Sequence, residues 1–419
     1  MTVELTAQER EIAAGEADEG SAMAMRIVTE AARLLGAARL IPIQSAHIDG
    51  AVYHGDSGTY FAEKLVADGA KVSVPSTLNV GALDLMGCSK QQLSGHEREM
   101  AGRMMRAYRQ LGCQPSWTCA PYQAGHRPAK GSDVAWGESN AVAFCNSVLG
   151  ARTNRYGDLL DIACAITGRA PYCGLHRPEN RAATFVFDVS GLPSQFFENE
   201  TAWPILGNLY GRQAENSIGV IDGIPGKPSE DDLKAFGAAA ASSGAVGLFH
   251  ISGVTPEAPS TEAACAGNRA EVIRVTSQMV LEAQQRLSTA EKPDRIDAVA
   301  VGSPHLSLRE IERLEAMIAG RRLVVPFYAC TGRHVLQGLE NAGSRRRLEE
   351  SGVTLVVDTC IVVTPMLPEL SGGVLMTNSG KFAHYAPGNT GYDVLYGGMR
   401  DCVESAVTGR PELTEMKSS

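Results

Sequence analysis

The sequence lacks several signatures that would place a large protein in a common functional class. No two of its ten cysteines have the C-x-x-C spacing, which argues against a zinc ribbon or a thioredoxin-like redox motif. Neither G-x-G-x-x-G after a strand nor G-x-x-x-x-G-K-[ST] occurs, so nicotinamide and nucleoside triphosphate chemistry are disfavoured. No apolar run approaches the ~20 residues that span a bilayer.

The sequence also lacks any concentration of positive charge. It has 38 Lys and Arg against 47 Asp and Glu, a formal net charge of −9, and no basic run. We therefore expect neither nucleic acid nor an anionic membrane as the main partner. The polar, acidic N-terminus is unlike a secretory signal, which predicts a cytoplasmic protein whose cysteines are mostly reduced thiols.

The sequence contains enough apolar residues to form a large core, since 44% of its 419 residues are hydrophobic. From 218 onward, strand and helix patterns alternate, which predicts an α/β protein with mainly parallel sheets flanked by helices. We expect two or three lobes, one covering roughly 216–364, and a polar tail at 411–419. Strands are expected at 40–45, 71–74, 183–189, 218–221, 245–251, 296–301, 323–328 and 353–357, and helices at 22–35, 89–111, 158–167 and 229–243. Capping boxes are expected at Thr6, Ser229 and Ser307.

Two cysteines and one serine occupy positions that suit metal ligands. Cys119 lies beside a proline turn, Cys360 follows the strand 353–357, and Ser303 follows the strand 296–301. If those strands share one sheet, the three side chains can face one ion or cluster, and thiolates favour iron–sulfur or zinc over magnesium. The spacing alone favours the alternative of two buried thiols and a turn serine. The other eight cysteines, Cys330 among them, are interpreted as structural.

Further polar groups gather after predicted strands and helices. In the predicted loop 46–55, His47, Asp49 and Tyr53 are candidate acid/base groups, although a hydrogen-bonded loop without chemistry fits equally well. A helix ending at Gly150 is followed by Arg152 and Arg155, a pair that suits a carboxylate or phosphate. The remaining candidates are Ser76, Thr77 and Asn79 after the strand 71–74, Asn146 in the helix, and Asn378, Ser379 and Lys381 near the C-terminus, where Lys381 is either an anion clamp or a surface lysine.

Several segments together resemble the aconitase X family, a divergent branch of the aconitase superfamily. The matching stretches span nearly the whole chain in order: 46–49 with Tyr53, 69–79, 119–122, 146–155, 174–176 with 179–181, 237–246, 302–305, 358–360, and 377–381 with 384–387. The resemblance implies an aconitase-like α/β architecture and an enzyme that dehydrates a hydroxy acid at an iron centre.

The resemblance also implies a ligand set and a substrate. Cys119 and Cys360 fall at cluster-cysteine positions, and the third position, cysteine in the phosphomevalonate type, is Ser303 here. A [2Fe-2S] cluster, or alternatively mononuclear iron, fits two cysteines better than a three-cysteine cluster. We therefore expect elimination of water from cis-3-hydroxy-L-proline to give Δ1-pyrroline-2-carboxylate. The alternatives are a mevalonate 5-phosphate dehydratase and, in another class, an iron-sensing regulatory or RNA-binding relative.

The resemblance further implies a small swivelling domain, which we do not expect within these 419 residues. Residues 1–410 are expected to form the large-subunit catalytic region, working in a heteromer with a separate small subunit. The expected roles are catalytic for His47, Asp49, Tyr53, His305 and Lys381, substrate-binding for Ser76, Thr77, Asn79, Asn146, Arg152, Arg155, Asn378 and Ser379, and metal-ligating for Cys119, Cys360 and Ser303.

Overall fold

The computed structural model describes residues 2–370 and 372–414, so residues 415–419 of the predicted tail lie outside the described residues. The chain divides into two compact units. One comprises the chain up to Leu83 together with Leu93–Ala182, and the other comprises Asp84–Gln92 and the chain from Ala183 on. The second unit contains the range 216–364 and extends beyond it on both sides.

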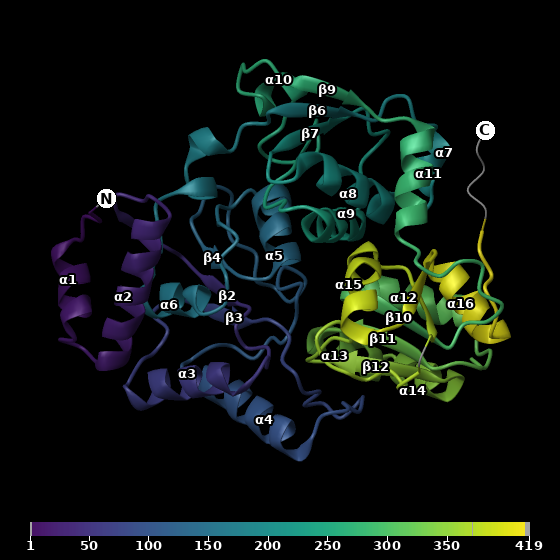
Figure 1. The fold of residues 1–419 in the computed structure, drawn as a ribbon, viewed down its shortest axis with the longest axis horizontal. Coiled ribbons are helices and arrows are strands. Elements are labelled where there is room, and N and C mark those ends of the chain that lie inside the picture. The colour runs from purple at the N-terminus through teal and green to yellow at the C-terminus, as the bar shows by residue number, and fades with distance from the viewer. Residues whose placement is uncertain (1, 371, 415–419) are drawn as a thin grey trace. The chain divides into compact units, whose positions relative to one another are not determined.

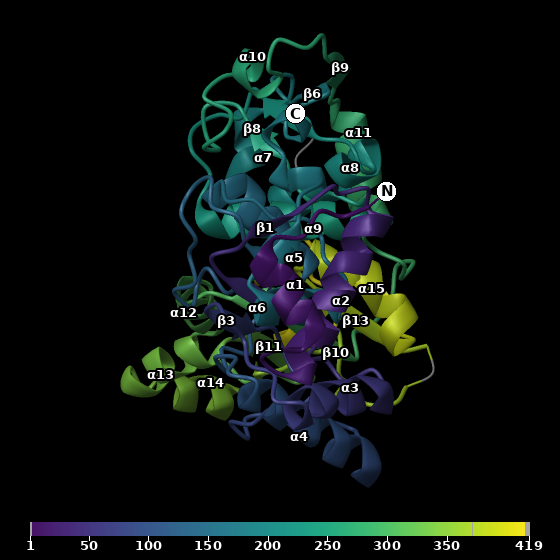
Figure 2. The ribbon, with the colours of Figure 1, turned by 90° about the vertical axis from the view of Figure 1, so that its left-hand side faces the viewer.

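The first unit is built around a three-stranded parallel sheet in the order β3-β2-β4 (Figure 1). The strands of the first unit are β1 (Leu40–Pro42), β2 (Ala46–Ile48), β3 (Ser76–Leu78), β4 (Ala135–Trp136) and β5 (Arg169–Pro171). Strands β1 and β5 form a separate antiparallel pair. Its helices are α1 (Ala7–Ala14), α2 (Glu19–Leu34), α3 (Asp56–Ala67), α4 (Gly95–Gln110), α5 (Ser139–Phe144), the π-helical turn η1 (Cys145–Leu149), α6 (Leu160–Thr167) and the short η2 (Gly174–His176) and η3 (Pro178–Asn180). Helices α3 and α4 pack side by side (Figure 2).

The second unit contains two parallel sheets. The first has the order β8-β7-β6-β9, from β6 (Phe185–Asp188), β7 (Gly219–Asp222), β8 (His250–Ile251) and β9 (Glu271–Arg274). The second has the order β12-β11-β10-β13-β14, from β10 (Ala298–Leu306), β11 (Phe327–Thr331), β12 (Val353–Val357), β13 (Val374–Thr377) and β14 (Asp393–Tyr396). The helices are α7 (Ser194–Glu198), α8 (Ala202–Ala214), α9 (Glu230–Ser243), α10 (Thr261–Ala264), α11 (Ser277–Arg286), α12 (Leu308–Ile318), α13 (Arg333–Asn341), α14 (Ser344–Ser351), α15 (Gly380–Thr390) and α16 (Met399–Thr408).

These units confirm the predicted α/β class with mainly parallel sheets flanked by helices. The capping boxes at Thr6, Ser229 and Ser307 are also confirmed, with each hydroxyl accepting a backbone N–H three residues on. Several boundaries were wrong. Residues 71–74 form no strand, because Val72 and Ser73 donate singly to Leu111 and Ala165 rather than to a ladder.

The other boundary errors are local. Helix α4 begins at Gly95 rather than 89, because Ser94 caps it. The predicted loop 46–55 begins with a strand, β2, and the strand expected at 245–251 is reduced to His250–Ile251. The strand expected at 296–301 continues through Leu306, and the one expected at 323–328 begins at Phe327.

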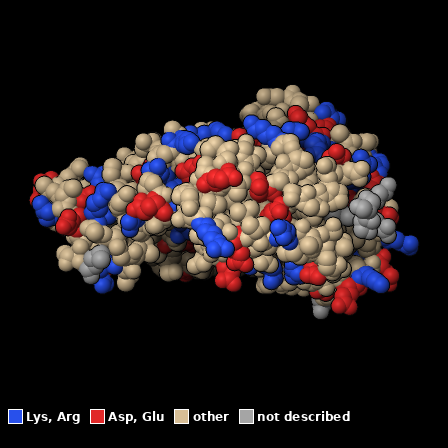
Figure 3. Space-filling view, turned by 90° about the horizontal axis from the view of Figure 1, so that it is seen from above, with Lys and Arg blue, Asp and Glu red and all other residues tan. Residues whose placement is uncertain are grey.

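Two surface properties bear on function. On the face shown in Figure 3, Lys and Arg side chains are interspersed with Asp and Glu and do not form a single basic patch. Within the described residues, no helix combines the length and the apolar character that a membrane crossing requires.

Candidate functional site

In the first unit, polar side chains meet at the carboxyl ends of β2, β3 and β4. His47 lies in register with Thr77 on one neighbouring strand and with Trp136 on the other. Asp49 and Asn79 each follow the end of a strand, and the Asn79 amide donates to Oδ1 of Asp49. The carboxyl edge of a parallel sheet is a common place for ligands, so the predicted candidates His47, Asp49, Thr77 and Asn79 are brought together where chemistry is expected.

Asp49, Glu138 and Asp161 form an acidic cluster at this edge. Oδ2 of Asp161 accepts the backbone N–H of Asp49 at 2.6 Å. Loss of hydration raises the pKa of Asp49 to about 7, and the neighbouring carboxylates, Glu138 foremost, add to the rise, whereas the hydrogen bond from Asn79 opposes it. Burial likewise raises the pKa of Asp161 to about 7. A half-buried carboxyl group such as Asp49, poised near neutral pH, suits a general acid or base.

Gly137 allows the acidic cluster to assemble, because there is no room for a side chain at this position. A Cβ atom there would lie 2.7 Å from Cβ of Asp49 and 2.9 Å from Oδ2 of Asp161. We expect Gly137→Ala to lower the free energy of unfolding by about 1–3 kcal/mol in chemical denaturation. Gly157→Ala is the matched control, since a Cβ there meets nothing within 4 Å and is expected to cost less than about 1 kcal/mol. Equal stability of the two variants would contradict the close approach.

Several buried polar atoms near the same edge have no hydrogen-bond partner among the described residues. They are Nε2 of His47, Oδ1 of Asn79, Nε1 of Trp136 and Oδ1 of Asn140. Buried polar groups in proteins are nearly always paired, so a group of unpaired ones near a sheet edge indicates a place for a polar ligand or ordered water.

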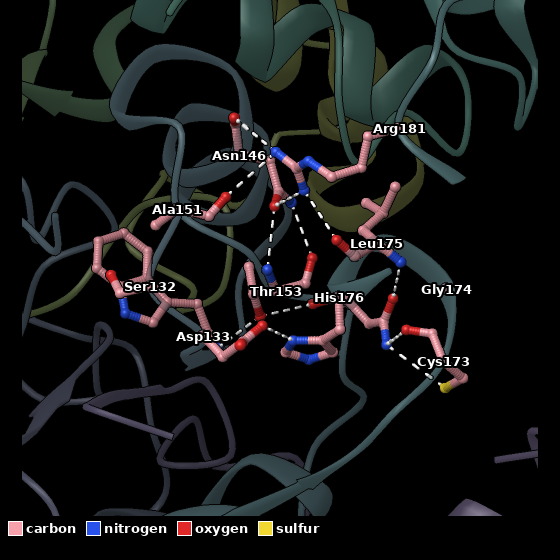
Figure 4. A network of polar contacts seen from close by, with 12 residues as sticks. Ser132, Asp133, Asn146, Ala151, Thr153, Cys173, Gly174, Leu175, His176 and Arg181 are labelled. Atoms are coloured by element: carbon pink, nitrogen blue, oxygen red, sulfur yellow. Dashed lines mark hydrogen bonds and ion pairs between the residues drawn. The ribbon is translucent and has the colours of Figure 1, made fainter. Parts of the chain in front are cut away.

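The segment after α5 is held by the buried Arg181, which lies in the matching stretch 179–181 but has no role among the expected site residues (Figure 4). Nη1 of Arg181 donates to Oδ1 of Asn146 at 3.0 Å, and Nη2 donates to the Ala151 carbonyl at 3.2 Å. The Asn146 amide in turn pairs with both backbone groups of Thr153, at 2.9 and 3.0 Å. Asn146, predicted to bind substrate, thus fixes the backbone after Arg152, while Arg181 fixes the backbone before it.

Four further candidates of this unit differ in their settings. Arg152 is half-buried, and its Nε has no hydrogen-bond partner among the described residues, whereas Arg155 is exposed. The Tyr53 hydroxyl donates to Oδ1 of Asp56 at 2.7 Å, and this hydrogen bond raises the pKa of Tyr53 to about 12. Tyr53 is therefore tied to the start of α3. The hydroxyl of Ser76 donates to the Val74 carbonyl at 2.9 Å.

In the second unit, the carboxyl ends of β10, β11 and β12 bring sulfur and hydroxyl groups together. Ser303 lies within β10, Cys330 within β11, and Cys360 three residues beyond β12. A hydrogen bond from the Cys330 thiol lowers the pKa of Cys360, and the Val362 N–H, the Lys381 charge and the Ser303 hydroxyl act in the same direction. These groups outweigh the effect of burial and favour the thiolate, the form of cysteine that binds metals.

The other predicted residues of this unit lie around the same edge. His305 is buried within β10, where its Nε2–H donates to the Thr359 carbonyl at 3.0 Å, and burial lowers the pKa of His305 to about 3. Ser379 caps α15, accepting the Phe382 N–H at 2.9 Å, and its hydroxyl donates to the Ser303 carbonyl. Asn378 and Lys381 are half-buried on either side of it.

The three predicted metal ligands are not carried by one sheet. Cys360 and Ser303 share the five-stranded sheet of the second unit, as expected, but Cys119 belongs to the first unit, where its carbonyl accepts from the Asn140 amide at 3.1 Å. The condition that the strands preceding Ser303 and Cys360 share one sheet is therefore met, whereas Cys119 lies outside that sheet. Within the described residues, no group of three or more His, Cys, Asp or Glu side chains is arranged to hold an ion. That the three bind one centre stays a prediction.

Three further groups were missed or misread in the sequence. Cys330 was interpreted as structural, yet its thiol contacts Cys360. Asp161 and His126 were not selected at all, although Asp161 binds the Asp49 backbone and His126 binds Thr77. The sequence did offer one signal for the acidic cluster. Glu138 is a titratable residue that follows closely after the strand β4.

Comparisons with known proteins cover nearly all of the chain. Sequence models of the aconitase X first, second and third domains match residues 2–179, 183–285 and 296–408. The chain is 43% identical over 412 residues to a Pseudomonas aeruginosa protein named cis-3-hydroxy-L-proline dehydratase, covering 97% of this chain and 70% of that one. It is 34% identical to the Methanocaldococcus jannaschii phosphomevalonate dehydratase large subunit, covering 96% of this chain and 99% of that one. The crystal structure of Thermococcus kodakaraensis aconitase X matches with a TM-score of 0.86 at 31% identity, covering 96% of this chain and all of that one.

Proposed function

This chain belongs to the aconitase X family, and from that premise we propose that it is the large subunit of a hydro-lyase acting on cis-3-hydroxy-L-proline. The observation that carries this proposal is the 43% identity to the Pseudomonas aeruginosa dehydratase across 97% of the chain. Serine in place of cysteine at position 303 supports the same substrate. The reaction removes the C2 proton and the 3-hydroxyl group as water, and the resulting enamine tautomerises to Δ1-pyrroline-2-carboxylate.

We propose that Cys360 and Cys119 hold iron as a [2Fe-2S] cluster, with mononuclear iron as the alternative and Ser303 as a neighbouring oxygen donor. The thiolate-favouring surroundings of Cys360 support this assignment, because soft sulfur ligands select iron over hard cations. When bound, iron supplies a Lewis acid for the substrate carboxylate or the departing hydroxyl group.

The protein's own groups are assigned to the proton and the carboxylate. Asp49, with its pKa near 7, takes the C2 proton as general base. The guanidinium of Arg152, whose backbone is fixed by Asn146 and Arg181, binds the substrate carboxylate together with Arg155. Lys381 and the neutral imidazole of His305 orient the leaving group.

We propose a separate small subunit as partner, in the cytoplasm. The match to 99% of the length of a protein named as a large subunit supports a two-chain arrangement. The ten cysteines form no disulfide within the described residues, which fits a reducing compartment.

The substrate assignment is tested by supplying two compounds side by side to the large subunit purified with its partner. We expect consumption of cis-3-hydroxy-L-proline and formation of Δ1-pyrroline-2-carboxylate. Mevalonate 5-phosphate, the substrate of the second candidate function, is expected to be consumed at least about a hundredfold more slowly, because the extra phosphate needs a site built to pair with it. Preference for mevalonate 5-phosphate would overturn the assignment.

The pH dependence of kcat/KM tests Asp49 as the base. The rate is expected to rise with pH and level off above an apparent pKa near 7, because only the carboxylate accepts a proton. Glu138→Gln, which removes a neighbouring charge, should move this apparent pKa down, and Asn79→Ala, which removes a stabilising hydrogen bond, should move it up. Glu30→Gln at an exposed pair on α2 is the control and should leave the profile in place. Shifts in the reverse directions would rule out Asp49.

A further inference from the structure

Four side chains of the first unit form a continuous hydrogen-bonded chain with one open end. Nδ1 of His47 lies 2.9 Å from the Thr77 hydroxyl, and the same oxygen lies 2.7 Å from Nδ1 of His126. Nε2 of His126 lies 2.8 Å from the hydroxyl of Ser45. The chain ends at Nε2 of His47, which is fully buried and has no hydrogen-bond partner among the described residues.

Along these three hydrogen bonds, every group must donate in the same direction. The Thr77 hydroxyl has a single proton, so it donates to one imidazole and accepts an N–H from the other. Burial lowers the pKa of both histidines, to about 4 for His126, so each ring carries one N–H at neutral pH. In one arrangement Nε2 of His47 is a bare acceptor, and in the other, with every bond reversed, it carries the proton.

We propose that the Ser45–His126–Thr77–His47 chain is a proton relay that connects the buried Nε2 of His47 with solvent. A proton arriving at Nε2 of His47 releases the proton on its Nδ1 to the Thr77 oxygen. The Thr77 hydroxyl proton passes to Nδ1 of His126, and the proton on Nε2 of His126 leaves through the Ser45 hydroxyl to water. No oxidant, reductant or leaving group is needed. The relay returns to its first arrangement when a proton enters from water at Ser45 and each transfer runs in reverse, so that the Nε2 proton of His47 passes to the site.

The surroundings of the relay support directional transfer. The Trp136 ring lies 5.6 Å from the His47 ring and 4.9 Å from the His126 ring, between centroids, and so holds both imidazoles in place. His47 is fully buried, His126 is half-buried, and Ser45, at the other end of the hydrogen-bonded chain, is 8% exposed. His47, in β2, lies two residues before Asp49, and Thr77, in β3, lies two residues before Asn79. This assignment rests on the proposed function, because a dehydratase must return the abstracted proton to water before its next turnover.

The kinetic test breaks the relay at its centre. Thr77→Val removes the shared hydroxyl and is expected to lower kcat at least about tenfold and to raise the solvent deuterium isotope effect, because proton transfer becomes limiting. Thr77→Ser, which restores the hydroxyl, should recover both. His126→Ala should be rescued by added imidazole, which reaches the half-exposed site. An unchanged isotope effect in Thr77→Val, or no rescue of His126→Ala, would overturn the relay.

A second measurement needs no substrate and so separates the relay from the proposed function. Without His126, the Thr77 hydroxyl is released to donate to Nδ1 of His47. The ¹⁵N chemical shifts of His47 should therefore move towards the Nε2–H tautomer in His126→Ala, but not when Thr77→Val is also present. If the wild type fails to dehydrate cis-3-hydroxy-L-proline yet shows this coupling, the relay stands and the substrate is wrong. If the ¹⁵N chemical shifts of His47 are the same in His126→Ala as in the wild type, the relay is excluded whether or not the protein is active.

Discussion

The Cys360→Ala variant, purified with the small partner, is expected to lose its iron, its visible absorption and its turnover together. The reason is that the surroundings of Cys360 lower the pKa of its thiol and so favour the metal-binding thiolate, which alanine cannot replace. Loss of the Lewis acid removes several kcal/mol of transition-state stabilisation, so kcat should fall at least about a thousandfold. Iron analysis, an absorption spectrum and a turnover assay on one preparation measure all three.

Two other cysteines of the same unit provide the comparison. Cys402→Ala should keep both iron and turnover. Cys402 is a buried residue of α16, where burial raises the pKa of its thiol and so disfavours the metal-binding thiolate. Cys330→Ala should bind iron more weakly as the pH falls, since it removes the largest cause of the lowered pKa of Cys360. A colourless, iron-free Cys360→Ala complex with full turnover would end the iron assignment.

The Asp49→Asn variant is expected to lose about 10²- to 10⁴-fold in kcat, because an amide cannot accept the C2 proton. The substitution should at the same time change stability in a pH-dependent way. In the folded protein the pKa of Asp49 is raised to about 7, so the carboxyl group destabilises the fold increasingly as pH rises from its ordinary value of 3.8 through 7. Asparagine resembles the protonated acid and avoids this cost.

The stability of Asp49→Asn relative to the wild type should therefore be higher at pH 8 than at pH 5. Urea unfolding of both proteins at the two pH values measures this difference. A large loss of kcat with a folded, alkaline-stabilised variant identifies Asp49 as the base. A variant with near-normal kcat, or a stability difference that is the same at both pH values, would contradict both its role and its raised pKa.

Local features of the fold could be read from the sequence, and tertiary ones could not. The capping boxes at Ser229 and Ser307 were predictable because their hydrogen bonds join residues three apart. The strand assigned to 71–74 was wrong because Val72 and Ser73 each form a single hydrogen bond with distant backbone rather than joining a ladder. Alternation of β and α patterns predicted mainly parallel sheets, but that the strands before Ser303 and Cys360 share one sheet stood only as a condition until the structure showed it.

The site was only partly predictable for the same reason. Cys330 has the appearance of any buried strand cysteine, and only the pairing of β11 with β10 and β12 brings it to Cys360. Arg181 reaches Asn146 across 35 residues of sequence, and Asp161 reaches Asp49 across 112. No local spacing encodes such contacts, so the groups that tune Asp49 and fix Arg152 emerge only from the folded chain.

Removal and return of iron tests the account most directly. The wild-type complex would be stripped with a chelator, then reconstituted with iron and sulfide, and assayed for cis-3-hydroxy-L-proline dehydration at each stage alongside iron and sulfide content. We predict that activity disappears with the iron and returns in proportion to it, with equal amounts of iron and acid-labile sulfide bound. Full turnover by the iron-free complex would contradict the account.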